Sequence, residues 1–359
     1  MNPIRLLDLG LVSPVRSQTI YHAVAHGMTQ ATPDTIILVS PNRPYVCIGY
    51  HQDPEKEVDL AYCAVHELPV YRREVGGGAV YLDAGQVFLQ WIFHANHVPP
   101  SLEERFELFI RPLVATYQAL GISAYHRPVN DVHVSGKKIG GTGAARMGIA
   151  EVLVGSLMFT FDKATMARVL KVSSEKMRDK VFESLQQYMT TMSEQLGRVP
   201  ERQEVLSLYV AQCAAGLNAE IAPGRLTSTE EAMTAEFDAR FASDEWLCLG
   251  GRAQRSVVKI HEGVWVGEGS VKAPGGLIRA TVRVRDGRID ALALSGDFTV
   301  LPASGVAGLE DALHGVPVAR EPLLASVDDC YRTLAIRSPG LTSEHIVEAI
   351  LVAAARSAD

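Results

Sequence analysis

Apolar and polar positions in the first part of the chain follow two different periods. Short runs of aliphatic and aromatic residues predict strands at residues 4–11, 35–40, 45–49, 87–94 and 151–161. Between the first two runs, apolar residues recur every three or four positions over residues 15–29, which predicts a helix with one buried face. Strands and helices therefore alternate, and a domain built from both is expected.

Two later helices carry start signals. Ser101 and Glu104 have the spacing of a capping box, in which the serine accepts from an amide three residues on while the glutamate reaches back. An apolar stripe follows and ends before Gly121, a residue type common just after a helix. Ser228 and Glu231 repeat the box and predict a helix to residue 241. Further helices are expected at residues 53–68, 171–191 and 200–215.

The C-terminal part reads as a separate α+β unit. Strands are predicted at residues 256–260, 264–267, 277–285 and 288–294, and Asp286-Gly287 is a strong signal for a hairpin turn. Helices are predicted at residues 308–314, 327–336 and 343–356. We place the boundary near Gly250-Gly251, which predicts two domains, 1–250 and 251–359.

Composition narrows the class of protein. With 359 residues the chain can hold two domains and bury a sizeable core, and 47% hydrophobic residues is an ordinary globular composition. A net charge of −7 argues against a general nucleic-acid-binding protein. The five cysteines are dispersed without metal-ligand spacing, which favours reduced thiols and a cytoplasmic location. Residues 349–355 are too few to span a bilayer, and Pro3, Arg5 and Asp8 interrupt any signal-peptide core, so no membrane association is expected.

The first stretch with candidate chemistry is Arg72-Arg73-Glu74-Val75-Gly76-Gly77-Gly78-Ala79-Val80. Glycine lets a ligand approach the backbone closely, exposed amides can face an anion, and two guanidiniums would add positive charge. The spacing is neither that of a phosphate-binding Walker loop nor that of a dinucleotide fingerprint. A hairpin turn beside a surface arginine pair is the alternative.

The second stretch is Asn130-Asp131-Val132-His133-Val134-Ser135-Gly136-Lys137-Lys138, followed by a run rich in glycine. It predicts two short strands around a Ser-Gly turn, with a flexible glycine segment after the lysines. Asp131 can hold Mg²⁺, and Lys138 can neutralise a phosphate or a reacting carboxylate. An exposed hairpin with solvated lysines is the alternative.

Together these stretches resemble one family. The pattern Arg-Arg-x-x-Gly-Gly-Gly-Ala-Val, followed by Asn-Asp-x-x-Val and Gly-Lys-Lys-Ile, is similar to the lipoate–protein ligase branch of the biotin/lipoate ligase superfamily. The resemblance extends to the opening residues 5–10 and 46–52 and to the tail, where 276–278 and 286–289 precede Ser295-Gly296-Asp297-Phe298. It implies a class II synthetase-like α+β catalytic domain, with a mixed sheet backed by helices, and a small accessory domain.

The resemblance also implies an activity. ATP and Mg²⁺ would activate lipoate or octanoate as an acyl-adenylate, and a lysine of a lipoyl-carrier protein would then accept the acyl group. The carrier would be a lipoyl domain or a protein like the glycine-cleavage H protein. The accessory domain would be needed to activate the free acid.

Site roles follow from the same resemblance. Lys138 would bridge the acyl carbonyl and the α-phosphate, and Arg73 would hold the acid carboxylate or the α-phosphate. Asn130 and Asp131 would serve the phosphates, with Asp131 as the magnesium ligand. The remaining predicted residues border the nucleotide (Gly76, Gly77, Gly78, Ala79 and Val80) or the acyl site (His51, Gln52, Val75 and Val154), and Gly76 and Gly77 are counted among the substrate-binding residues as well.

Departures from the family pattern surround the acyl and phosphate sites. Glu74-Val75 stands where small hydroxyl residues are usual, and Thr142-Gly143 replaces Ser-Ala. Val154 stands where some ligases have a histidine. Thr142 and Val154 are therefore counted among the substrate-binding residues, and the preferred acid stays open.

Three other functions remain. An octanoyltransferase of the same fold would need a reactive cysteine near Lys138, and no cysteine lies between Tyr71 and Met158. A biotin ligase would carry a Gly-Arg-Gly-Arg-type loop, which is absent. A non-catalytic lipoate-binding protein would not need Arg73, Asn130, Asp131 and Lys138, all of which are present.

Overall fold

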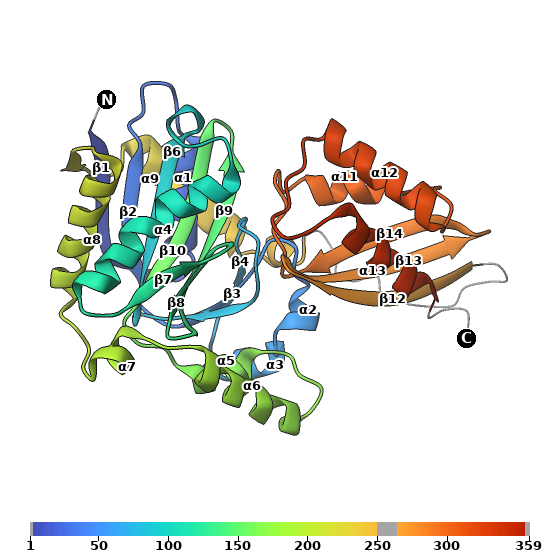
Figure 1. Ribbon diagram of the computed structural model, residues 1–359, viewed down its shortest axis with the longest axis horizontal. Coiled ribbons are helices and arrows are strands. Elements are labelled where there is room, and N and C mark those ends of the chain that lie inside the picture. The colour runs from blue at the N-terminus through green and yellow to red at the C-terminus, as the bar shows by residue number, and fades with distance from the viewer. Residues whose placement is uncertain (1–2, 250–263, 356–359) are drawn as a thin grey trace. The chain divides into compact units, whose positions relative to one another are not determined.

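The computed structural model describes residues 3–249 and 264–355, and its contacts divide the chain into two compact units (Figure 1). The first unit comprises Met1–Cys47, Val58–Tyr71 and Val80–Ser243, and the second comprises Ile48–Glu57, Arg72–Ala79 and Asp244–Asp359. Two short N-terminal segments, one with the triple glycine, thus belong to the second unit. The predicted boundary at Gly250-Gly251 and the predicted strand 256–260 lie outside the described residues, and the division 1–250 and 251–359 stays a prediction.

An eight-stranded mixed sheet forms the centre of the first unit. Its strand order is β11-β1-β2-β6-β10-β9-β8-β7, in which β11, β1 and β2 are parallel and the other neighbours are antiparallel. The strands are β1 (Ile4–Val12), β2 (Thr35–Pro41), β6 (Gln86–His94), β7 (Ala124–Arg127), β8 (Asp131–Val134), β9 (Lys137–Met147), β10 (Ala150–Met158) and β11 (Ile221–Pro223). The near-continuous apolar runs of β2 and β6 are buried throughout, as expected for strands that are covered on both faces.

Helices cover both faces of this sheet. The helices of the first unit are α1 (Arg16–His26), α3 (Leu60–Val65), η1 (Ala95–His97), α4 (Leu102–Ala119), α5 (Lys163–Val169), α6 (Glu175–Tyr188), α7 (Met192–Leu196), α8 (Arg202–Leu217) and α9 (Ser228–Phe241). The helices α4 and α8 pack together, as do α1 and α9 (Figure 1). This arrangement confirms the mixed sheet backed by helices.

Two neighbouring residues of β6 identify the two faces. Gln90 donates to the Ser17 carbonyl of α1 at 2.8 Å, so its face is the α1 face. The indole of Trp91 packs edge-on against Phe109 of α4, with ring centroids 5.1 Å apart, so its face is the α4 face. Because side chains alternate along a strand, the residues of β6 and β10 and residues 142–147 of β9 can be assigned to one of these faces from the register.

A small sheet with the order β4-β3-β5 continues from the first unit, and its strands β3 and β5 are antiparallel. Its strands are β3 (Tyr45–Ile48), β4 (Val70–Arg72) and β5 (Val80–Leu82). The ends of β3 and β4 lead into the two N-terminal segments of the second unit. These strands therefore set where His51, Gln52 and the glycine loop start.

The second unit contains an antiparallel meander and helices. Its elements are α2 (Pro54–Glu57), α10 (Asp244–Leu247), β12 (Val264–Ala273), β13 (Gly276–Arg285), β14 (Arg288–Gly296), α11 (Gly305–Ala312), α12 (Arg320–Thr333) and α13 (Ser343–Ala355). Asp286 and Gly287 connect β13 to β14 with φ of +51° and +71°, the signs that a type I′ hairpin turn requires. The predicted hairpin is therefore confirmed.

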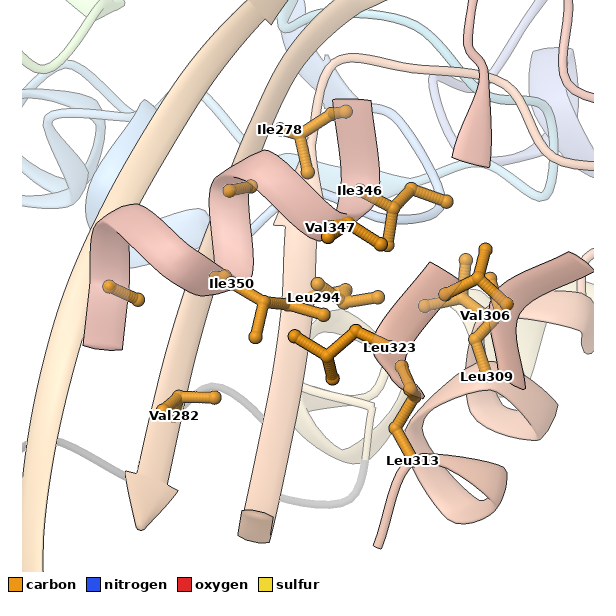
Figure 2. Packing of buried hydrophobic residues seen from close by; sticks show 14 of the residues in the cluster. Ile278, Val282, Leu294, Val306, Leu309, Leu313, Leu323, Ile346, Val347 and Ile350 are labelled. Carbon is orange, nitrogen blue, oxygen red and sulfur yellow. The ribbon is translucent and has the colours of Figure 1, made fainter. Parts of the chain in front are cut away.

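The core of the second unit follows from strict alternation along β13. Ile278, Ala280, Val282 and Val284 are buried while the residues between them are partly exposed. These side chains meet the apolar faces of α11, α12 and α13, as Figure 2 shows for Val282, Leu323 and Ile350. A core of this extent shows that the C-terminal part is more than an appendage of the first unit.

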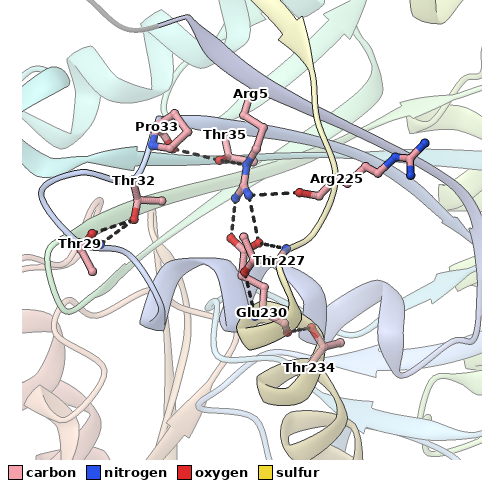
Figure 3. Close-up of polar contacts among 9 residues, drawn as sticks. All are labelled: Arg5, Thr29, Thr32, Pro33, Thr35, Arg225, Thr227, Glu230 and Thr234. Carbon is pink, nitrogen blue, oxygen red and sulfur yellow. Dashed lines mark hydrogen bonds and ion pairs between the residues drawn. The ribbon is translucent and has the colours of Figure 1, made fainter.

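Three sequence predictions need correction. The helix expected over residues 53–68 is two short helices, α2 and α3, because Val58 between them pairs with Leu170. The second capping box starts one residue earlier, with Thr227 as N-cap and Glu230 as its partner (Figure 3). The glycine run after Lys138 is no flexible segment, since it forms part of strand β9.

Glu230 also binds a second partner. It forms a two-pronged ion pair with Arg5 of β1, with nitrogen–oxygen distances of 2.5 and 3.0 Å (Figure 3).

Within residues 3–249 and 264–355, no helix combines the length and apolar composition needed to cross a bilayer.

Candidate active site

The predicted catalytic lysine lies on the β8–β9 hairpin of the first unit. Ser135 and Gly136 form its turn with φ of +49° and +82°. In the pairing of the two strands, Asp131 lies opposite Gly141 and His133 lies opposite Lys138. Asp131 and His133 are two residues apart on one strand, so they share a face.

Lys138 and Asp131 form an ion pair on this face. The Lys138 Nζ lies 2.7 Å from Asp131 Oδ1, and the side chains are 39% and 30% exposed. A pair this exposed stabilises a protein by at most about 1 kcal/mol. Its presence is therefore better explained by the chemistry that the two charges offer than by stability.

Gly141 provides the space in which the two charged groups meet. A Cβ at this position would lie 2.9 Å from Lys138 Nζ and 3.5 Å from Asp131 Oδ1. The backbone of Lys138 is fixed as well, because its carbonyl accepts from the Thr190 amide at 2.9 Å. The backbone of Lys138, near the start of β9, is therefore held on both sides, and only its side chain is free to move.

Asn130 and Thr142 hold each other across the start of the hairpin. The Thr142 amide and hydroxyl both donate to the Asn130 carbonyl, at 2.9 and 2.8 Å, and the Asn130 amide group donates to the Thr142 carbonyl. Thr142 lies on the α4 face, since a Cβ on Gly155 opposite it would touch both Thr142 Cγ2 and Phe109. Its predicted role in substrate binding stays a prediction, and it can act there through Asn130.

Val154 occupies the α1 face of the sheet. It pairs with Gly143 of β9 and with Gln90 of β6, whose side chain reaches α1. The side chain is partly exposed beside a glycine that adds no bulk. This environment is compatible with an apolar wall, and the predicted contact of Val154 with an acyl chain stays untested.

Two residues of this site were missed in the sequence. The sequence pattern predicts only a flexible run at Gly141 and a hairpin strand at His133, with no role in the site for either residue. The period of two puts His133 on the face of Asp131, whereas Gly141 lies opposite Asp131 only because the register shifts between Val132 and His133, which no local pattern predicts.

The two arginines of the glycine stretch behave differently from expectation. Arg72 is 1% exposed, and its guanidinium donates to main-chain carbonyls of Gly49, Tyr50, Gln52 and Leu247 at 2.5–3.2 Å. The indole of Trp246 in turn donates to the Arg72 carbonyl at 2.9 Å. Arg72 is therefore a structural residue of the second unit, and the expectation that both guanidiniums face an anion is wrong for it.

Arg73 stabilises the glycine loop from within. Its Nη2 donates to the carbonyls of Gly76 and Gly78, each at 2.9 Å, and its own amide donates to the Ile48 carbonyl. The side chain is partly exposed. The geometry preorganises the loop, and a role of Arg73 towards a carboxylate or phosphate stays a prediction.

The glycines of the loop allow close approach of neighbouring backbone. A Cβ on Gly76 would lie 2.6 Å from the Phe298 carbonyl, and a Cβ on Gly49 would lie 1.9 Å from the Gly77 carbonyl. Gly77 has φ of +99° and donates its amide to the Phe298 carbonyl at 3.4 Å. Part of the glycine signal thus reports packing inside the second unit, and the predicted nucleotide contacts of Gly76, Gly77, Gly78, Ala79 and Val80 stay untested.

His51 and Gln52 belong to the same cluster. The His51 ring stacks on Phe298, with centroids 5.1 Å apart and planes at 19°, and its carbonyl accepts from the Gly296 amide. Gln52 Oε1 accepts from the Gly49 amide at 2.9 Å. Val75 is 1% exposed and is a buried core residue. These three residues support the loop, and their contact with an acyl chain stays a prediction.

A cavity of about 130 Å³ lies in the second unit beside this cluster. Its described lining includes His51, Gln52 and Asp53 together with Glu268 and Glu310. Burial raises the pKa of the Asp53 carboxyl, despite an opposing hydrogen bond from the Glu55 amide. A wall with several carboxylates does not suit an apolar acyl chain, so this cavity is not the expected tunnel.

All five cysteines are free thiols, and four of them are buried. Burial raises the pKa of Cys63 to about 11 and that of Cys213 to about 12, and it raises the pKa of Cys330. Cys47 is 0% exposed. Cys248 alone is partly exposed, and it belongs to the second unit.

Comparison with known proteins places this fold and hairpin in a family. Residues 15–214 match the model of the lipoyl protein ligase A/B catalytic domain. Lipoate–protein ligase 1 of Staphylococcus aureus is 26% identical over 277 residues, covering 76% of this chain and 78% of the relative. Octanoyltransferase LipM of Brevibacillus brevis is 26% identical over 273 residues, covering 68% of this chain and 99% of the relative.

A solved structure agrees with these relatives. One chain of the bi-partite lipoate protein ligase from Thermoplasma acidophilum, described together with its E2 lipoyl domain, superposes with a TM-score of 0.63 at 25% identity. The match covers 72% of this chain and all of that one. Because the family model spans more than half of the sequence, the chain belongs to the lipoyl protein ligase A/B catalytic domain family, an enzyme family whose members similar to it include lipoate–protein ligases and octanoyltransferases.

Proposed function

We propose that the chain is an ATP-dependent lipoate–protein ligase. It would activate lipoate or octanoate as an acyl-adenylate and transfer the acyl group to a lysine of a lipoyl-carrier protein. The observation that carries the proposal is the Lys138–Asp131 pair, held 2.7 Å apart on the β8–β9 hairpin and partly open to solvent. Such a pair offers a mobile cation and an oxygen ligand side by side, which is what chemistry on a phosphate and a carboxylate needs.

The first half-reaction joins the acid to AMP. A carboxylate oxygen of the acid attacks the α-phosphorus of ATP, the bond to the β-phosphate oxygen breaks, and pyrophosphate leaves. Negative charge accumulates on the α-phosphate oxygens as the new bond forms. Lys138 would stabilise this charge, and its flexible stem lets the ammonium follow the charge after it leaves Asp131.

The second half-reaction forms the amide. The carrier lysine, as a free amine, attacks the acyl carbonyl carbon. The carbon–oxygen bond to AMP then breaks, AMP leaves, and the amine nitrogen loses a proton. Lys138 would stabilise the carbonyl oxygen in this step, so one residue serves both half-reactions.

Asp131 fits the magnesium ion that ATP chemistry needs. Its carboxylate supplies the oxygen ligand that Mg²⁺ prefers, and Lys138 occupies only Oδ1. When bound, the ion would neutralise charge on the phosphates. Asn130 would position this corner of the site, because its amide group and carbonyl both bond to Thr142.

The transferase alternative is favoured by one observation, the match to LipM over 99% of that relative's length. Its route would need a thiolate that attacks the acyl donor and forms a thioester. The raised pKa values of Cys63, Cys213 and Cys330 and the complete burial of Cys47 leave Cys248 as the one thiol suited to that role. The 68% coverage also leaves about a third of this chain without a counterpart in LipM, which favours the ligase.

The test is mass spectrometry of a purified lipoyl domain after incubation with the full chain, lipoate or octanoate, and Mg-ATP. We expect a mass gain of one acyl group that requires ATP and releases pyrophosphate. The Lys138→Ala variant should form no acyl-AMP, a loss of more than about a thousandfold, because it lacks the charge that stabilises both transition states. Lys137→Ala is the matched control, since the Lys137 Nζ donates to the Gln186 carbonyl at 3.4 Å.

Each outcome separates the alternatives. A gain from an octanoyl carrier without ATP, lost in Cys248→Ser, would establish the transferase. Acyl-AMP formation by Lys138→Ala at the normal rate would contradict the role of Lys138. Lipoate binding without any transfer, across lipoyl domains and proteins like the glycine-cleavage H protein, would identify a lipoate-binding protein.

The free state of all five thiols supports a reducing, cytoplasmic setting for this activity.

A further inference from the structure

His133 stands out because one of its ring nitrogens lacks a hydrogen-bond partner. The side chain is 5% exposed, and among the described residues Nε2 has no partner within hydrogen-bond distance. Asp131 Oδ2 lies 3.8 Å from this nitrogen. A buried polar atom of this kind costs free energy unless something binds it.

The other ring nitrogen identifies the tautomer. His133 Nδ1 lies 3.3 Å from the carbonyl of Gly136 in the hairpin turn. A carbonyl can only accept, so Nδ1 carries the hydrogen. In the neutral ring Nε2 then has a lone pair, and this lone pair faces a carboxylate oxygen.

A lone pair and a carboxylate oxygen 3.8 Å apart repel each other unless a cation, either a metal ion or a proton on Nε2, lies between them. Lys138 does not supply it, because its Nζ lies on the other carboxylate oxygen, Oδ1. A histidine that donates one nitrogen to a backbone carbonyl and leaves the other free has the arrangement typical of metal-binding histidines. The register supports this, because Asp131 and His133 share one face of β8 and reach the same space.

We propose that Asp131 Oδ2 and His133 Nε2 together bind a divalent transition-metal ion. One imidazole nitrogen and one carboxylate oxygen suit Mn²⁺, Co²⁺ or Zn²⁺, whereas Mg²⁺ prefers oxygen ligands alone. With two protein ligands, the remaining positions stay open to water or to phosphate oxygens. The inference rests on the proposed function and deepens it, because the ion would occupy the position at Asp131 that Mg²⁺ takes with ATP and would serve the nucleotide there.

The experiment uses the full chain and Mn²⁺ alone, without ATP or acid, so that it does not depend on ligase activity. Binding is measured as loss of the free Mn²⁺ signal in continuous-wave electron paramagnetic resonance. Pulsed measurement then reads the coupling of the bound ion to a ¹⁴N nucleus. We expect one site with a ¹⁴N coupling, and weak competition by Mg²⁺.

The test variant is His133→Asn. Its side-chain amide can still donate to the Gly136 carbonyl, as Nδ1 does, but it has no counterpart of Nε2. We expect the ¹⁴N coupling to disappear and the affinity to fall by about tenfold or more. His126→Asn is the matched control, because His126 Nε2 contacts the Val129 carbonyl within the same hairpin region.

Three results would overturn the proposal. They are the absence of Mn²⁺ binding by the wild-type chain, a bound ion without ¹⁴N coupling, and equal affinity in His133→Asn. The first result would leave a proton on Nε2 as the bridging cation. A positive result together with failed ATP-dependent ligation would keep the metal site and reject the ligase, so the two proposals can fail separately.

Discussion

The β8–β9 hairpin and the glycine loop are alike in sequence and opposite in use. Each combines glycines with a basic pair, Lys137-Lys138 in one and Arg72-Arg73 in the other. In the hairpin, Gly141 makes room for charged side-chain ends, and Lys138 stays 39% exposed. In the loop, the glycines make room for backbone, and Arg72 is 1% exposed among carbonyls. A glycine-rich basic motif therefore indicates close approach, and only the structure shows what approaches.

A difference in hydrogen bonding explains why the two basic pairs diverge. Arginine carries five donors in a planar fork, so it can satisfy several carbonyls at once when it is buried. Lysine is a point charge with three donors on a flexible stem, and it can exchange one anionic partner for another. Arg72 therefore holds main-chain carbonyls of the second unit in place, while Lys138 on β9 remains available for chemistry.

The largest expected effect tests the structural half of this comparison. Arg72→Ala should destabilise the second unit by about 4 kcal/mol, because it leaves several buried carbonyls without a donor. Hydrogen exchange followed by mass spectrometry should show lost protection in segments 48–57 and 244–249. Arg73→Ala, which removes two bonds inside one loop, should have a smaller effect on these segments. Equal protection in Arg72→Ala and the wild type would break the comparison.

The ion pair of Arg5 and Glu230 provides a buried counterpart to the exposed Lys138–Asp131 pair. It is a charge pair of the first unit like Lys138–Asp131, but its side chains are only 12% and 7% exposed. Burial alone would raise the pKa of the Glu230 carboxyl, but hydrogen bonds from Arg5 and the Thr227 amide outweigh it, so the pKa lies below its ordinary value. This pair should stabilise the fold, whereas the hairpin pair should not.

Glu230→Gln should therefore cost about 3 kcal/mol of stability at pH 7. Since the folded pKa is lowered, the contribution of the carboxylate is complete above the ordinary value of 4.5 and is lost as the pH falls through the folded pKa. The difference between variant and wild type should shrink below about pH 4.5. Protection factors of β1 and α9, corrected for intrinsic exchange at each pH, give the measurement. A difference in stability that does not depend on pH would show that the shape of the side chain, and not its charge, causes the loss. The control variant is Glu231→Gln, at an exposed position.

The sequence predicted much of the framework and little of the side-chain pairing. Long runs such as β6 and the capped helix α4 were found because burial imposes their period locally. The glycine run of β9 was misread, because its strand conformation comes from pairing with β10 and not from its own residues. The capping box moved by one residue because Thr227 and Ser228 are both suitable N-caps, and the Arg5 ion pair fixes Glu230 as the partner.

The burial of the Arg72 side chain could not be predicted from the sequence either. Its partners lie at residues 49–52 and 247, and no local pattern connects those positions. Lys138 and Asp131, by contrast, were placed together correctly, because a tight Ser-Gly turn brings residues a few positions apart onto neighbouring strands. Candidate sites carried by one hairpin are thus easier to predict than sites assembled from distant segments.

The smallest expected effect isolates what Gly141 contributes to the hairpin. In Gly141→Ala the new Cβ would lie 2.9 Å from Lys138 Nζ, so the flexible end of the lysine must move while the backbone stays. We expect unchanged stability and about a tenfold lower rate of acyl-AMP formation, close to 1.4 kcal/mol in the activation free energy. Gly140→Ala is the matched control, because a Cβ there would meet only ordinary contacts at 3.5 Å and beyond. An equal loss in both variants would indicate a general need for glycine in β9, and no loss in either would show that Lys138 reaches its substrate without the space beside Asp131.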